Sequence, residues 1–181
     1  TGAGAVTDAL ARDAFAAAFS LLPASFAGDA AVRLRIHLAS AMAGMAFTQA
    51  GLGICHALSH ALGGAFHVPH GRLNAILLPA VVETNAAVVG HRYAELARHA
   101  GLGATADTVA VHNLKNGLIR LRRTLALPDT LAQAGVSPRD LHEKAEGIVA
   151  AALADPCCGT NPVAPDAAGL RRILEAVAGH G

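Results

Sequence analysis

The sequence predicts an all-α fold, a helical-bundle domain, because apolar residues recur at helical spacing along most of the chain and strand patterns are nearly absent. Capping residues also stand where the helices would begin and end. The only apolar run that could form a strand, residues 75–85, contains Pro79, which lacks the N–H that a central strand needs. With 181 residues, 53% of them apolar, the chain suits one domain over 1–181 with a sizeable core.

Two helices are predicted in the N-terminal third. The first covers residues 8–22 and stops at Pro23, because proline interrupts the hydrogen-bond ladder of a helix. The second begins after Asp29, a favourable N-cap residue, and ends at Gly51. Its apolar residues surround the helix almost completely, which indicates a central, buried helix.

Further helices are predicted after residue 90. Residues 91–101 form a short amphipathic pattern, and residues 106–125 form a longer one whose arginines point to water. Ser137 serves as the N-cap of the next helix, with Pro138 in its first turn, and Asp166 caps the last. These segments contain no internal repeat and no low-complexity linker.

A cluster of histidines lies in residues 51–71, which read GLGICHALSHALGGAFHVPHG. Four residues of α-helix turn by about 400°, so His56 and His60 lie about 40° apart on one face. Cys55 is rotated by about 100° from His56 and therefore faces elsewhere.

The residues after His60 predict a hairpin of two helices. Gly63 and Gly64 permit the left-handed exit that ends a helix, and Pro69 introduces the next one. Such a turn can bring His70 back beside the first helix, and three convergent imidazoles suit iron, zinc, nickel or copper. The spacing alone also arises by chance in a chain with ten histidines, and we expect ordinary core or surface roles for the others: His37, His67, His91, His99, His112, His142 and His180.

The histidine segment also carries a resemblance. GLGICHALSHALGGAFHVPHGRLNAILLPAVVETN resembles the signature of the iron-containing (group III) alcohol dehydrogenases, with its H-x3-H-x9-H-G core followed by LP and an asparagine. TDALARDAF, ASAMAGMAFTQAGLG, RYAELARHAGL and DPCCGTNP are similar to that family as well. The resemblance extends over essentially the whole chain, yet it corresponds only to the C-terminal half of a full-length member. The N-terminal nucleotide-binding domain is therefore expected to be absent, and the missing initiator Met is consistent with a fragment.

The resemblance implies specific roles for the three histidines. His56 and His70 would be metal ligands for Fe²⁺ or Zn²⁺, and His60 would be a catalytic residue beside the nicotinamide and the substrate. Family members take two more ligands from a D-x3-H segment, and no such segment occurs in these residues. NAD(P) would be bound mostly by the missing domain, and the chain has no G-x-G-x-x-G loop.

The function implied is that of the C-terminal domain of a metal-dependent, NAD(P)-linked alcohol dehydrogenase or aldehyde reductase for short primary alcohols. Gly71 would leave more room beside His70 than the alanine often found there in maleylacetate reductases. Two alternatives remain open. One is a non-catalytic helical scaffold or binding protein derived from that fold, and the other is a small histidine-rich metal-binding bundle.

Composition limits the partners and the compartment. A formal net charge of +1 without a run of Lys or Arg argues against nucleic acid. Residues 38–58 approach the length of a membrane span, but Gln49 and several glycines favour a buried helix with a break. The adjacent Cys157 and Cys158 are poorly spaced for a disulfide or for one metal ion, so we expect free thiols in a cytoplasmic protein. The apolar face left by the missing domain would favour a homo-oligomer.

The isolated 181-residue chain is expected to show no alcohol dehydrogenase activity and to bind iron or zinc poorly, because two imidazoles are an incomplete coordination shell. The measurement is the reduction of NAD⁺ or NADP⁺ by the purified chain with ethanol or 1-propanol. Turnover by the chain alone would contradict the expectation.

Overall fold

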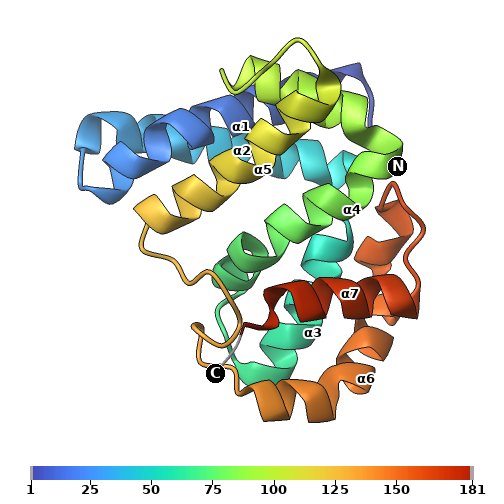
Figure 1. Ribbon diagram of the computed structural model, residues 1–181. Helices are drawn as coiled ribbons and strands as arrows, with labels where there is room; N and C mark the ends of the chain where they lie inside the picture. The colour runs from blue at the N-terminus through green and yellow to red at the C-terminus, as the bar shows by residue number, and fades with distance from the viewer. Residues whose placement is uncertain (1, 180–181) are drawn as a thin grey trace. The chain divides into compact units, whose positions relative to one another are not determined.

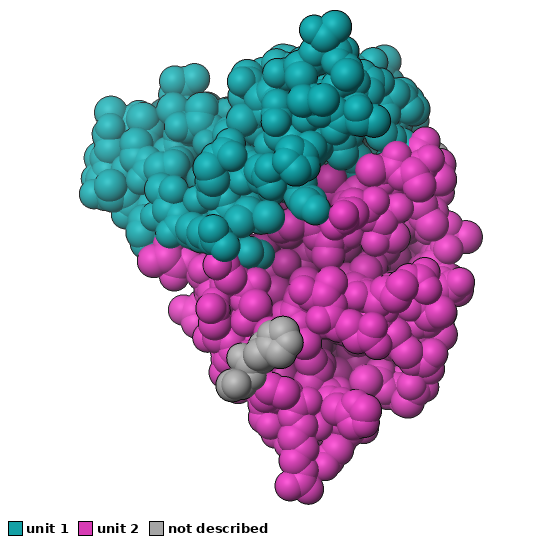
Figure 2. Space-filling view, in the orientation of Figure 1, with its two compact units in different colours: residues 1–51, 89–125 teal, residues 52–88, 126–181 magenta. Residues whose placement is uncertain are grey.

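All regular structure that the computed structural model describes, over residues 2–179, is helical (Figure 1). Seven α-helices and one short 3₁₀ helix are present and no strand occurs in this range, which confirms the predicted all-α fold. His180 lies outside the described residues. The chain divides into two compact units, residues 1–51 with 89–125 and residues 52–88 with 126–181 (Figure 2). That the whole chain forms one domain stays a prediction.

Unit 1 contains α1 (Ala5–Phe26), α2 (Ala30–Ala50), the end of α4 (His70–His99) and α5 (Asp107–Thr124). Helices α1 and α2 lie side by side (Figure 1). Their connection is short because Gly28 adopts a left-handed conformation, with φ of 99°, and Asp29 accepts a hydrogen bond from the N–H of Ala31 at 2.8 Å. The predicted cap of α2 is thus confirmed.

The prediction that the first helix stops at Pro23 is wrong. Helix α1 continues to Phe26 with Pro23 inside it. A proline close to the end of a helix removes one hydrogen bond and leaves the following turn free to form. The N–H of Ala27 accordingly donates to the carbonyl of Pro23 at 3.0 Å.

The prediction of a buried α2 is also wrong. Only Ala39 and Ala46 of this helix are buried, whereas Leu34, Leu38 and Met45 are each more than half exposed. Within the described chain α2 packs chiefly on α1 through small side chains, so its remaining apolar face has no cover. Apolar residues on all sides of a helix indicate that every face could be buried, but they do not show which segments would cover those faces.

The arginines of α5 are not all directed to water as predicted. Arg120 and Arg123 are exposed, but Arg122 is buried. An arginine can pack its aliphatic stem along apolar neighbours while its guanidinium remains hydrogen-bonded, so its charge alone does not place it at the surface.

Helix α4 includes residues 75–85 and most of residues 91–101, which were predicted as separate segments. It runs through Pro79, and its backbone leaves helical geometry at Val89, where the division between the units falls. By length and composition α4 could cross a membrane, as could α2 with α3 across their break. The first part of α4 contributes Leu73, Ile76 and Leu77 to the core of unit 2, so these two features are weak evidence for a span.

Unit 2 contains α3 (Ile54–Phe66), the first part of α4, α6 (Pro138–Ala154), the 3₁₀ helix η1 (Pro156–Thr160) and α7 (Ala167–Ala178). Ser137 and Asp166 cap α6 and α7 as predicted, because their side chains accept the N–H groups of Asp140 and Gly169. The fully buried large side chains of this unit are Ile54, Leu58, Leu62, Leu73, Ile76, Leu77, Leu131 and Leu170.

The turn between α3 and α4 forms as a hairpin, but not through the residues predicted. Gly63 and Gly64 remain inside α3, and His67 takes the left-handed conformation with φ of 56°. The carbonyl of Pro69 accepts the N–H groups of Arg72 and Leu73, so Pro69 introduces α4 as expected. Glycine permits a helix to end without requiring it, and here Ala65 and Phe66, which pack against the core of unit 2, favour a later exit.

Asn161 connects three segments of unit 2. Its Oδ1 accepts from the N–H of Ile54 at 3.3 Å and from Asn85 Nδ2 at 3.1 Å. Its Nδ2 donates to Asn85 Oδ1 and to the carbonyl of Val163, both at 2.8 Å. A Cβ at Gly53 would lie 2.7 Å from Asn161 Oδ1, so only glycine permits this close approach. Asn161 therefore holds the start of α3 against η1 and α4.

Leu58→Ala is expected to lower the free energy of unfolding by about 2–5 kcal/mol, because a fully buried leucine leaves a cavity when truncated. The measurement is urea denaturation followed by circular dichroism. Leu153→Ala, in the same unit but at a residue that is 38% exposed, is the control and should cost clearly less, about 1 kcal/mol. Equal losses in the two variants would contradict the described core.

Asn161→Ala is expected to cost about 1–3 kcal/mol of unfolding free energy, because it leaves the Asn85 amide and the Ile54 N–H without this partner in a half-buried place. Thermal and urea unfolding would measure the loss. Asn116→Ala, which removes one exposed hydrogen bond to His112, is the matched control and should change stability by about 0.5 kcal/mol at most. A neutral Asn161→Ala variant would show that the connection is dispensable.

Candidate metal centre

Three imidazoles converge at the hairpin of α3 and α4 in unit 2. The ring centroids of His56 and His60 are 6.0 Å apart, those of His56 and His70 are 4.9 Å apart, and those of His60 and His70 are 5.1 Å apart. One ring nitrogen from each histidine lies within 4.8 Å of the other two. The structure thus brings together the three histidines singled out from the sequence, whereas His67 serves as the C-cap of α3 and belongs to neither candidate metal-binding group.

The sequence produces this convergence by helical spacing and by one turn. His56 and His60 follow each other by one turn of α3, whose opposite side buries Leu58 and Leu62. The left-handed His67 then reverses the chain, so that His70, the first residue of α4, returns to the same place.

His56 is a half-buried imidazole at the start of α3. Burial lowers the pKa of His56, and the nearby His70 and His60 rings lower it further, while Asp155 opposes them. A lowered pKa favours the neutral imidazole near neutral pH, and the neutral form is the one that can bind a metal ion.

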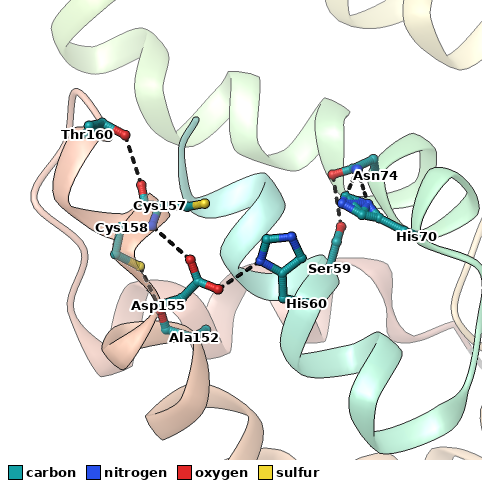
Figure 3. Close-up of polar contacts among 9 residues, drawn as sticks. All are labelled: Ser59, His60, His70, Asn74, Ala152, Asp155, Cys157, Cys158 and Thr160. Carbon is teal, nitrogen blue, oxygen red and sulfur yellow. Dashed lines mark hydrogen bonds and ion pairs between the residues drawn. The ribbon is translucent and has the colours of Figure 1, made fainter. Parts of the chain in front are cut away.

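His70 is held by a polar network that begins in the core. Asn74 Nδ2 donates to His70 Nδ1 at 2.8 Å, and Asn74 Oδ1 accepts from Ser59 Oγ at 2.9 Å (Figure 3). The Cys55 thiol also donates to Asn74 Oδ1, at 3.3 Å. Burial raises the pKa of Cys55 to about 12, so this thiol stays protonated. Cys55 belongs to neither candidate metal-binding group of the described residues.

His60 has a carboxylate partner that the sequence analysis missed. His60 Nδ1 donates to Asp155 Oδ2 at 2.8 Å, and Asp155 Oδ1 accepts the N–H of Cys157 at 2.8 Å (Figure 3). Burial works to raise the pKa of Asp155, but the hydrogen bonds from Cys157 and His60 outweigh it and lower that pKa. Asp155 therefore remains a carboxylate that orients the His60 ring.

The sequence around Asp155 indicates only a local role, because an aspartate before Pro156 is typical of a helix N-cap, and Asp155 does cap η1. Its distance of 95 residues from His60 along the chain hid the contact. The hydroxyl of Thr160 donates to the carbonyl of Leu52, just before α3, and this bond keeps η1 beside that helix. Only the packing of η1 against α3 therefore reveals the His60–Asp155 pair.

The two adjacent cysteines have different surroundings. Cys158 is buried and its thiol donates to the carbonyl of Ala152 at 2.8 Å. Cys157 is half-buried, and its sulfur, a His60 nitrogen and an Asp155 oxygen lie within 4.8 Å of one another. Burial raises the pKa of Cys157 to about 11, and the Asp155 carboxylate adds to that shift. The cysteines are free thiols, as expected, and they do not face one ion together.

The chain matches a known family over nearly its entire length. Residues 1–178 match the family described as "Fe-containing alcohol dehydrogenase family, C-terminal". Among curated proteins, the NADPH-dependent butanol dehydrogenase of Clostridium saccharobutylicum is 36% identical over 94% of this chain and 44% of its own length. The 1-propanol dehydrogenase of Salmonella typhimurium is 41% identical over 93% of this chain and 47% of its own length.

Solved structures give the same result for the fold. A crystal structure of 1,3-propanediol oxidoreductase matches with a TM-score of 0.92 and 29% identity over 98% of this chain and 46% of that one. The iron-containing alcohol dehydrogenase of Thermococcus thioreducens matches with a TM-score of 0.87 and 33% identity over 97% and 44%. The chain spans about half the length of the relatives it matches. It belongs to the Fe-containing alcohol dehydrogenase family and corresponds to the C-terminal, all-helical part of its members.

Proposed function

We propose that these 181 residues are the metal- and substrate-binding domain of an NAD(P)-linked alcohol dehydrogenase or aldehyde reductase that acts on short primary alcohols. The observation that carries the proposal is the convergence of His56, His60 and His70 in a chain of this family. The relatives named above as butanol and 1-propanol dehydrogenases support a short primary alcohol as the substrate.

His56 and His70 would hold the metal ion. Neutral imidazole nitrogen is a ligand type that suits Fe²⁺ and Zn²⁺, and the lowered pKa of His56 favours that neutral form, so the donors present fit the ion. When bound, the metal would supply Lewis-acid polarisation of the alcohol or aldehyde oxygen. Two imidazoles do not complete a site, and the resemblance implies that the remaining ligands come from a D-x3-H segment outside these residues.

His60 would be the residue that exchanges a proton with the substrate. Its Nδ1 is engaged by Asp155, which leaves Nε2 as the ring atom available to accept or return the hydroxyl proton. The side chain of His60 is 45% exposed, so a small alcohol can reach it, whereas that of Asp155 is only 17% exposed. Asp155 would act through His60, as a positioning residue that sets the tautomer and the angle of the ring.

The nicotinamide cofactor would be bound mostly outside this chain. Hydride transfer requires the carbon of the substrate to lie against the nicotinamide, so the face of unit 2 that carries His60 would border the cofactor. Gly71 lies next to His70, and a Cβ built there meets no atom of the described residues within 4 Å. This open space beside the proposed ligand is consistent with a site that admits small substrates.

The experiment is a chimeric enzyme in which this chain replaces the matching part of the 1-propanol dehydrogenase of Salmonella typhimurium. With iron supplied, we expect oxidation of 1-propanol coupled to reduction of NAD⁺ or NADP⁺. His56→Ala should lower kcat/KM by about 100-fold or more with loss of iron, because it removes a ligand. His60→Gln should lower kcat by about 10²–10⁴-fold with iron retained, because it removes the proton carrier.

The control variant is His67→Asn, which changes an exposed histidine of the same hairpin and keeps a residue type that tolerates the left-handed conformation. It should leave both turnover and iron content unchanged. Iron retained in His56→Ala, or full activity in His60→Gln, would contradict the proposed roles even if the chimera turns over.

A further inference from the structure

A second set of metal-ligand side chains lies beside the histidine cluster. It consists of His60 on α3 with Asp155 and Cys157 at the start of η1, and we refer to it as the His60–Asp155–Cys157 set (Figure 3). One nitrogen, one oxygen and one sulfur of this set lie within 4.8 Å of one another. All three residues belong to unit 2.

The geometry is close to that of a bound ion. Zinc binds nitrogen and oxygen at about 2.0–2.2 Å and sulfur at about 2.3 Å, so tetrahedral ligands lie roughly 3.4–3.7 Å apart. His60 Nδ1 and Asp155 Oδ2 are 2.8 Å apart, and the Cys157 sulfur lies within 4.8 Å of a His60 nitrogen and an Asp155 oxygen. An ion bound between the three side chains would have to separate His60 Nδ1 from Asp155 Oδ2 by roughly 0.6–0.9 Å and replace their hydrogen bond.

Charge and donor type select the class of ion. A thiolate, a carboxylate and a neutral imidazole carry two negative charges together, which balances a divalent cation. A mixed nitrogen, oxygen and sulfur set suits zinc and other thiophilic ions, whereas magnesium and calcium prefer oxygen alone. The proton of the Cys157 thiol would be released to solvent as the sulfur binds.

The surroundings of the set are built to hold it in place. Asp155 Oδ1 already accepts the Cys157 N–H, so Oδ2 is the oxygen directed at His60. The Cys158 thiol donates to the carbonyl of Ala152, which fixes the turn that presents Cys157. A bound ion would leave the bonds of Asp155 Oδ1 and of the Cys158 thiol intact. It would replace only the hydrogen bond between His60 and Asp155.

We propose that His60 Nδ1, Asp155 Oδ2 and Cys157 Sγ form a binding site for a thiophilic divalent cation such as zinc, cadmium or cobalt, distinct from the His56–His70 pair. The fourth position would be filled by water. Zinc bound here would overturn the expectation from the sequence that the isolated chain binds zinc poorly, because that expectation counted only the two imidazoles of His56 and His70. Binding here does not depend on the proposed function. If His60 is the proton carrier, an ion at this site also fixes its ring and competes with catalysis, which makes the site inhibitory.

The test is a titration of the reduced, purified 181-residue chain with Co²⁺, observed by absorption. A cobalt–thiolate bond gives a near-ultraviolet charge-transfer band that imidazole ligands alone do not give. We expect the band to saturate at one equivalent and to disappear in Cys157→Ser. Cys158→Ser is the matched control, changing the neighbouring buried thiol, and should retain the band.

Variants of the other ligands separate this site from the histidine cluster. Asp155→Asn and His60→Gln should weaken cobalt binding at least about tenfold, since each removes or weakens one of three protein ligands. His56→Ala should retain the band at the same midpoint. Circular dichroism establishes that each variant is folded, and cadmium bound to the folded wild type is measured in parallel by equilibrium dialysis.

Three results would overturn the proposal. They are absence of the band in the folded wild-type chain, persistence of the band in Cys157→Ser, and its loss in a folded His56→Ala variant. None of these results depends on turnover, so an inactive chimera would leave this proposal standing, and an active chimera would not establish it.

Discussion

Burial of one side of α3 determines where the candidate ligands lie. Ile54, Leu58 and Leu62 follow one another by a turn each and are almost completely enclosed. Removing these side chains from water stabilises one orientation of the helix about its axis, by roughly 1.5–3 kcal/mol for each large apolar side chain. In that orientation His56 and His60 project from another side of the helix. Ser59, which binds Asn74, lies between the buried side and the histidine side.

The start of α3 is held as firmly as its buried side. Asn161 binds the N–H of Ile54 and the amide of Asn85, and the Thr160 hydroxyl binds the carbonyl of Leu52. These contacts come from residues about a hundred positions further along the chain, and they carry Asp155 and Cys157 with them to His60. The same short segment that secures the helix thus supplies Asp155 and Cys157 to the His60–Asp155–Cys157 set.

The chain spans about half the length of the relatives it matches, and two of its features bear on the proposal that it works with a further domain. The proposed iron ligands are two imidazoles from one hairpin, which is fewer than a catalytic site needs. Helix α2 exposes Leu34, Leu38 and Met45 although its composition is that of a buried helix. Both features support that proposal.

The sequence by itself determined the helical class, most helix boundaries, the caps at Asp29, Ser137 and Asp166, and the family through the H-x3-H-x9-H-G pattern. These are local properties, because periodicity and capping depend on residues within a few positions of one another. Helix ends at Pro23 and at the Gly63–Gly64 pair were predicted wrongly, since both residue types weaken a helix that packing can still extend.

Only the tertiary structure decided that Arg122 is buried, that α2 is not, and that Asp155 and Cys157 lie beside His60. Each of these facts depends on which distant segment covers a given face. Spacing along a helix can show that two side chains share a face, but it contains no information on what the fold brings against that face.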